Sequence, residues 1–189
     1  KTFTAYKKTL KNINTILNNG GQTELDGWLG YLSRLSVEIT EKRIKYMENL
    51  SLILKENISK GLSELTGSSF NLIFEVQTGW PKEVDSLDEN NIISYLLNNK
   101  KNITKTKHLN YGPHRASIDF SLNGLGENHL SRGEQKKMSI VFWMLQVLEL
   151  VKNKKKPIVL IDDISSELDE IKIKTIIDFL TEIEVQIFI

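Results

Sequence analysis

The most informative part of this sequence is Leu130-Ser-Arg-Gly-Glu-Gln-Lys-Lys137, which leads into an apolar segment. Ser131 and Glu134 stand three residues apart, the spacing of a capping box, in which each side chain accepts a hydrogen bond from the other residue's backbone N–H. Apolar residues such as Val141 and Leu145 then recur at helical spacing. We therefore predict that a helix begins at Ser131.

The first turn of this helix suits an anion. Its unpaired backbone N–H groups and the positive end of the helix dipole attract negative charge, and Gly133 has no side chain to keep a phosphate away. Taken alone, the motif is also typical of an ordinary capped core helix. The neighbouring motifs decide between these interpretations.

A second motif, Pro157-Ile-Val-Leu-Ile-Asp-Asp163, is an apolar run that ends in two acids. This pattern is typical of a buried strand in a parallel sheet, which carries side chains to the edge where ligands bind. Because unpaired carboxylates are costly to bury, we expect a metal-linked role. Asp162 would hold Mg²⁺, directly or through water, and Asp163 would orient or activate an attacking water. Alternatively, Asp163 caps the following turn.

The third motif, Ser166-Glu-Leu-Asp169, precedes a helical stripe that includes Ile173, Ile176 and Leu180. Read alone, it is a helix start with acidic residues in its first turn. In this order and spacing, however, the three motifs resemble the signature loop, the Walker B strand and the D-loop of an ABC-type ATPase head of the SMC and DNA-repair branch.

A fourth segment, Tyr111-Gly-Pro-His-Arg115, narrows this resemblance. Together with the alternating residues that follow it, the segment resembles the RecF family of bacterial recombination mediators. Ala116 and Ser117 stand where RecF proteins often carry acids, and Glu134 stands where many members have Gln. The implied fold class is α/β, the C-terminal half of an ABC-type (SMC/RecF-like) P-loop ATPase head with an antiparallel helical hairpin arm.

The resemblance also implies a head that forms a homodimer when ATP is bound. The signature loop of one subunit would close on the γ-phosphate of ATP held by the other subunit, while the catalytic acids Asp162 and Asp163 would act on the ATP of their own subunit. The residues implied at the ATP site in trans are Ser131, Arg132, Gly133, Glu134 and Gln135, and those implied at the dimer interface are Ser166, Glu167 and Asp169.

The phosphate-binding loop that such a head requires does not occur in this sequence. The string G-x-x-x-x-G-K-[ST], which surrounds phosphates with backbone amides and a lysine, is absent from Lys1 to Ile189. The nearest candidate, Gly61 to Ser69, lacks the lysine. We therefore expect a fragment that lacks ATPase activity alone, with the missing loop upstream of Lys1.

The chain is expected to divide into a helical arm over residues 1–67 and a part of the ATPase lobe over residues 68–189. Asn18-Asn-Gly-Gly21 separates two apolar helical stripes, so two helices should pack antiparallel, the second of about 38 residues. The alternative is a plain helical hairpin with no role beyond packing. Further along, we predict a strand over 70–76, a helix over 88–98, and a strand over 118–122 that enters a hairpin turn.

Composition excludes several classes of protein. The chain has 189 residues, a net charge of +1 and no cysteine, so disulfide frameworks and thiolate metal sites are ruled out. Its histidines lack metal-ligand spacing, and no nucleophile elbow occurs. The longest apolar stretch, Ile140 to Val151, is too short to span a bilayer. We expect a soluble bacterial protein of the cytoplasm, without membrane association.

Two lysine clusters, at residues 100–108 and 152–156, make nucleic acid a possible partner, although each is also typical of a solvated loop. The candidate anion or DNA contacts are Arg115, Lys105, Lys107 and Lys154. For Arg115, the alternative is that it mainly pins the loop that carries it.

From the resemblance we expect part of a DNA recombination and repair ATPase that uses ATP and Mg²⁺. It would bind duplex DNA near single-strand gaps, dimerise on ATP, and help other mediator proteins load a recombinase. Two alternatives remain: a non-catalytic dimerisation or docking module built on a helical arm, or the head fragment of another SMC-like ATPase.

Overall fold

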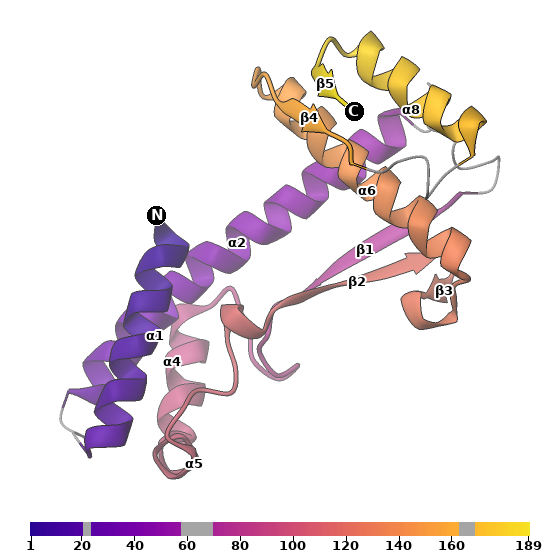
Figure 1. Cartoon of the computed structure of the whole chain (residues 1–189). Coiled ribbons are helices and arrows are strands. Elements are labelled where there is room, and N and C mark those ends of the chain that lie inside the picture. Colours follow the sequence, from indigo (N-terminus) through magenta and orange to yellow (C-terminus); the bar gives the residue numbers. More distant parts are fainter. Residues whose placement is uncertain (21–23, 58–69, 163–168) are drawn as a thin grey trace. The chain divides into compact units, whose positions relative to one another are not determined.

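The computed structural model describes residues 1–20, 24–57, 70–162 and 169–189, which form two compact units (Figure 1). The first unit comprises Lys1–Tyr46 and Val76–Ile118, and the second comprises Met47–Glu75 and Asp119–Ile189. Residues 76–118 thus cluster with the first 46 residues. The predicted boundary between residues 67 and 68 lies outside the described residues and stays a prediction.

The first unit contains helix α1 (Thr2–Asn19) and most of helix α2 (Leu25–Asn57), whose residues from Met47 onward belong to the second unit. Helix α1 ends at Gly20, whose left-handed backbone (φ 75°) is easily adopted by glycine. The Thr2 hydroxyl donates to the Glu38 carboxylate over 2.7 Å, so the start of α1 lies beside the middle of α2 and the helices are antiparallel, as predicted. The continuation of α2 toward residue 65 lies outside the described residues.

A core fills the first unit between these helices, α4 (Glu89–Asn98) and α5 (Lys100–Thr106). Asp88 caps α4 by accepting from the backbone N–H of Asn90 over 2.8 Å, which confirms the predicted helix. The fully buried members of this core are Tyr6, Ile13, Leu25, Leu29, Leu32, Ile92 and Leu96.

A three-stranded sheet of order β1-β2-β3 comprises β1 (Leu72–Gln77), β2 (Ser117–Leu122) and β3 (Leu125–Gly126). Strands β2 and β3 form the predicted hairpin around Asn123 and Gly124, whose φ angles of 52° and 82° suit a tight two-residue turn. In the second unit, the rings of Phe74 and Phe120 pack edge-on against Phe142 of helix α6 (Arg132–Lys152), with centroids 5.7 and 5.0 Å away.

The remainder of the second unit contains the 3₁₀ turn η3 (Glu127–His129), α6 (Arg132–Lys152), β4 (Ile158–Leu160), α8 (Glu170–Glu182) and β5 (Gln186–Phe188). Strands β4 and β5 are parallel, with Val159 opposite Ile187. The prediction of a buried β4 is wrong for two of its three residues. Val159 is 3% exposed, whereas Ile158 and Leu160 are 60% and 74% exposed. Among the described residues only β5 pairs with β4, so its other side chains are not covered.

Among the described residues, none of the helices combines the length and the apolar character that a membrane crossing requires.

Candidate nucleotide-contacting site

The start of α6 has the capping box that the sequence predicts. The Ser131 side chain accepts from the backbone N–H of Glu134 over 3.3 Å. In return, one oxygen of the Glu134 carboxylate accepts from the Ser131 backbone N–H over 2.8 Å and from the Ser131 hydroxyl over 2.7 Å. Two of the N–H groups that a helix start leaves unpaired are therefore satisfied within four residues.

These hydrogen bonds also set the charge at this helix start. The Ser131 hydroxyl, and then the Ser131 backbone N–H, lower the pKa of Glu134 below its ordinary value. The carboxylate therefore stays ionised at the positive end of the helix dipole.

The residues around the cap are open to solvent. Ser131, Arg132 and Gly133 are all exposed, and a Cβ at Gly133 would meet nothing within 4 Å. Gln135 has a different role, because its side-chain amide donates to the carbonyls of Glu127 and Leu130 over 3.2 Å each. Gln135 thus holds the turn η3 against the helix start, a role that the motif alone did not indicate.

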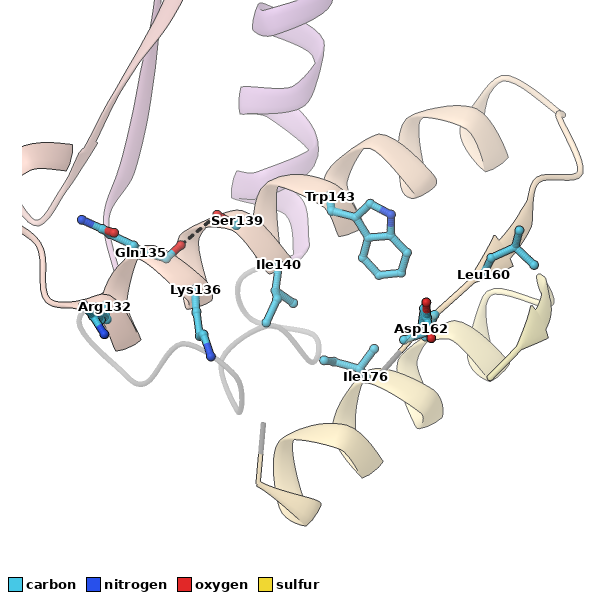
Figure 2. A pocket seen from close by; sticks show the side chains of 10 residues that line it. Arg132, Gln135, Lys136, Ser139, Ile140, Trp143, Leu160, Asp162 and Ile176 are labelled. Atoms are coloured by element: carbon cyan, nitrogen blue, oxygen red, sulfur yellow. Dashed lines mark hydrogen bonds between the residues drawn. The ribbon is translucent and has the colours of Figure 1, made fainter. Parts of the chain in front are cut away.

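A pocket of about 700 Å³ lies between α6 and the end of β4 (Figure 2). Figure 2 shows Arg132 and Lys136 at one end and Asp162 at the other, with Ile140 and Trp143 between them. The structure therefore brings three predicted site residues to one pocket. These are Arg132, Gln135 and Asp162, and the further lining residues are Lys136, Ser139, Ile140, Trp143, Leu160, Ile161 and Ile176.

The sequence interpretation missed Lys136, Ser139 and Trp143 as lining residues. With Arg132 they recur at spacings of four, three and four, so a helical projection places them on one face. The stripe of apolar core residues on α6 is the stronger pattern in the sequence, so this second stripe was not recognised.

The acidic motifs are only partly described. Asp162 is exposed and lies just beyond the end of β4, separated from it by Ile161, and a single carboxylate suits a Mg²⁺ ion that is also held by phosphates. Asp163, Ser166 and Glu167 lie outside the described residues. Asp169 caps α8 by accepting from the Lys172 backbone N–H over 2.9 Å and forms an ion pair with the Lys172 ammonium. The Lys172 side chain, followed by its backbone N–H, lowers the pKa of Asp169.

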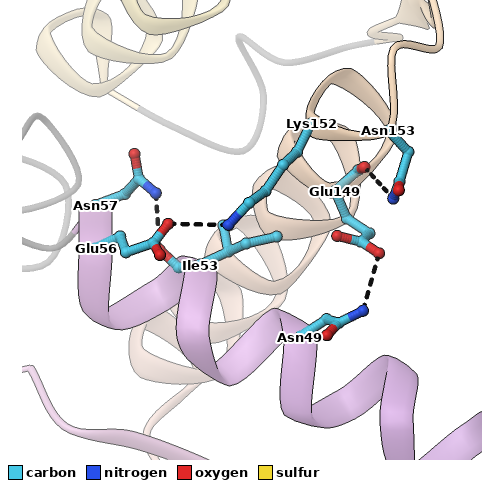
Figure 3. Close-up of polar contacts among 7 residues, drawn as sticks. All are labelled: Asn49, Ile53, Glu56, Asn57, Glu149, Lys152 and Asn153. Carbon is cyan, nitrogen blue, oxygen red and sulfur yellow. Dashed lines mark hydrogen bonds and ion pairs between the residues drawn. The ribbon is translucent and has the colours of Figure 1, made fainter.

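The far end of α6 is attached to the end of α2 by polar contacts within the second unit (Figure 3). Glu149 is a charged residue only 8% exposed, and its carboxylate accepts from the Asn49 side chain over 3.4 Å. One turn away, Lys152 pairs with Glu56 over 3.2 Å at the surface. These contacts hold the helix that carries the candidate site, and the sequence did not indicate them.

The basic candidates do not gather at the pocket. Lys105 lies on α5 and Lys107 ends it, both in the first unit, whereas Lys154 follows α6 in the second unit. Arg115 ends the 3₁₀ turn η2 (Pro113–Arg115) of the first unit. All four side chains are exposed.

Comparisons with known proteins give the family context. No protein-family model matches the chain. It is 27% identical over 188 residues to the DNA replication and repair protein RecF of Geobacter metallireducens, and 29% identical over 189 residues to that of Geotalea uraniireducens. Each alignment covers 97% of this chain and 50% of the relative. The chain thus spans about half the length of the curated relatives it matches.

Two solved structures of similar fold cover the whole chain. The recombination mediator protein RecF with ATP, in the RecFOR pathway, matches with a TM-score of 0.79 and 27% identity, over 51% of its own length. The second, RecF-ATPrS, matches with a TM-score of 0.76. The predicted fold class is therefore confirmed: the chain has the fold of half of an ABC-type ATPase head.

Within that class, the chain is RecF-like along nearly its whole length in both sequence and fold. This similarity agrees with the prediction of a C-terminal RecF portion.

Proposed function

We propose that this chain is the signature-bearing part of a RecF-like ATPase that binds ATP between two copies of its head and acts on DNA in recombination and repair. In the intact protein, ATP binding assembles a homodimer on duplex DNA near a single-strand gap. The dimer helps other mediator proteins load a recombinase, and ATP hydrolysis releases it. The chain alone, which has no phosphate-binding loop in its sequence, does not hydrolyse ATP.

The observation that carries this proposal is the arrangement at the start of α6. The capping box orders the helix start, yet Ser131, Arg132 and Gly133 remain exposed, and no atom of the described residues would lie within 4 Å of a Cβ at Gly133. An ordered, uncovered set of backbone N–H groups suits a phosphate that a second subunit brings. An ordinary core helix would not require an open first turn.

The pocket beside this helix start supports a role close to nucleotide. It places the cationic side chains of Arg132 and Lys136 on α6 and the carboxylate of Asp162 at the end of β4 (Figure 2). Asp162 would hold the Mg²⁺ that accompanies ATP and offsets phosphate charge. Asp163 would orient or activate the attacking water, and Ser166, Glu167 and Asp169 would lie at the interface between the two heads.

A dimerisation experiment on the full-length protein tests this function. Wild-type protein should change from monomer to dimer when ATP and Mg²⁺ are added, measured by light scattering coupled to size-exclusion chromatography. Ser131→Arg places a long side chain in the first turn of α6, where the γ-phosphate of the partner's ATP should dock. This variant should remain monomeric with ATP while binding ATP as the wild type does.

The matched control is Thr15→Arg, which adds the same side chain at an exposed threonine of α1. It should dimerise normally. If Ser131→Arg dimerises at the same ATP concentrations as the wild type, the signature loop does not act on the ATP of the partner subunit. Absence of ATP-dependent dimers in the wild type would remove the proposed function itself.

A further inference from the structure

The turn that contains Gly112, Pro113, His114 and Arg115 is held in place by contacts from four other parts of the first unit. Gly112 has φ 131° and ψ 178°, a backbone conformation that is essentially restricted to glycine. Its N–H donates to the Gly79 carbonyl over 2.8 Å. A Cβ at Gly112 would lie 2.6 Å from the Tyr6 hydroxyl, so the turn and α1 are in direct contact.

Gly79 allows the segment after β1 to lie directly against the turn at residues 112–115. It has φ 84°, and a Cβ there would lie 2.2 Å from the Gly112 carbonyl oxygen and 2.8 Å from the Ala116 backbone nitrogen. Both obstacles are backbone atoms, which cannot rotate away as a flexible side chain can. The segment after β1 and the turn therefore fit together only because both positions are glycine.

Both ring nitrogens of His114 have hydrogen-bond partners within the first unit. Its Nε2 lies 3.2 Å from the Leu109 carbonyl, which can only accept, so Nε2 carries the hydrogen. Nδ1 is then the acceptor for the Tyr6 hydroxyl at 2.8 Å. Burial lowers the pKa of His114 and raises that of Tyr6, so both groups are neutral at pH 7.

Arg43 of α2 supplies the last contact. Its guanidinium donates to the Pro113 carbonyl over 2.7 Å and lies over the Phe3 ring, 5.4 Å from its centroid. Its lowered pKa results mainly from burial.

Arg115 differs from the rest of this turn. Its backbone N–H donates to the Gly112 carbonyl over 2.8 Å, but its side chain is exposed and makes no hydrogen bond or ion pair with the described residues. Its charge contributes to the lowered pKa of His114. Arg43 likewise has no ion pair within the described residues, so the positive charge on both sides of Pro113 has no neighbouring carboxylate bonded to it.

We propose that this clamped turn presents the Arg115 guanidinium as a fixed contact for a phosphate of the DNA backbone. The inference rests on the proposed function only in requiring that the protein binds DNA. A guanidinium recognises phosphate oxygens through paired N–H donors, and a pre-ordered turn reduces the entropy that binding would otherwise cost.

Salt-dependent DNA binding of the full-length protein tests this contact, with a fluorescein-labelled duplex and fluorescence anisotropy from low to moderate salt. The slope of log K against log salt is negative, and loss of one phosphate contact should decrease its magnitude by about 0.9. Arg115→Gln should show that decrease and bind roughly tenfold more weakly at low salt, equally for unrelated sequences. Arg115→Lys should retain most of the slope. Arg34→Gln, which removes an exposed charge from α2, is the matched control and should behave as wild type.

Tyr6→Phe tests whether the contacts that hold the turn at residues 112–115 also position Arg115. This variant removes the hydroxyl that holds His114 but keeps the ring. It should weaken DNA binding in wild-type protein but cause little further loss in Arg115→Gln, because the two changes act on the same contact. Additive losses would overturn the positioning role.

The remaining outcomes distinguish the sources of phosphate. If Arg115→Gln retains the wild-type affinity and slope for DNA, the contact is overturned while the proposed function stands. If it weakens ATP binding and leaves DNA binding unchanged, the phosphate belongs to ATP and the DNA contact is likewise overturned. Failure of the wild type to bind DNA would remove the DNA role of the proposed function together with this contact.

Discussion

The start of α6 and the turn at residues 112–115 each expose a candidate site residue, but the residues that hold each of them in place lie at very different distances along the sequence. The helix start is ordered by residues within a few positions of itself, chiefly Ser131 and Glu134. The turn is ordered by residues far away in the sequence, including Tyr6 and Arg43. Because the start of α6 is ordered by its own residues, its first turn can stay open to a partner. The turn at residues 112–115 is contacted from several sides, so only the Arg115 side chain is free to bind a ligand.

Substituting glycine with alanine in each region should give the largest contrast. Gly112→Ala forces a Cβ against the Tyr6 hydroxyl and strains the backbone, so it should lower the free energy of unfolding by about 3 kcal/mol. Gly133→Ala meets nothing within 4 Å and should change it by less than about 1 kcal/mol. Urea unfolding followed by circular dichroism measures both. Equal effects would show that the two regions are not held differently.

Removing one hydroxyl from the clamp should have an intermediate effect. Tyr6→Phe leaves Nδ1 of His114 without its donor and should cost about 1–3 kcal/mol of unfolding free energy. Tyr31→Phe, at an exposed tyrosine of α2, is the control and should cost almost nothing. The same urea titration applies, and an unchanged midpoint for Tyr6→Phe would contradict the buried hydrogen bond.

The smallest effect should be a dependence on pH at the helix start. The pKa of Glu134 is lowered in the folded state, so its carboxylate stabilises the fold above its ordinary pKa of 4.5, and this stabilisation is lost as pH falls through the lower folded value. Glu134→Gln should therefore be less stable than wild type at neutral pH, and the difference should shrink below pH 4.5. Thermal unfolding across that range measures it, and a constant difference would contradict the ionised capping box.

The difference between local and long-range contacts also explains which features could be predicted from the sequence. The capping box at Ser131, the helix over residues 88–98 and the Asn123-Gly124 turn were predictable because each depends on neighbours a few residues away. The clamp around His114 was not predictable, because its partners at positions 6, 43 and 79 have no pattern that links them.

The exposure of β4 shows a second limit. An apolar strand indicates burial in some sheet, but the sequence does not say which residues supply the neighbouring strands. The pocket residues Lys136 and Trp143 were missed for a related reason, because the core stripe of α6 was the stronger pattern.

Mixing two defective full-length proteins shows whether the start of α6 acts on ATP held by a partner subunit. Ser131→Arg should damage the ATP site of its partner, and Asp162→Asn should damage the site of its own subunit. In a mixed dimer, both defects then fall in one site and the other site is intact. We predict that each variant alone lacks ATP hydrolysis and that mixing them restores it. If mixing restores no activity although mixed dimers form, the signature residues do not act in trans.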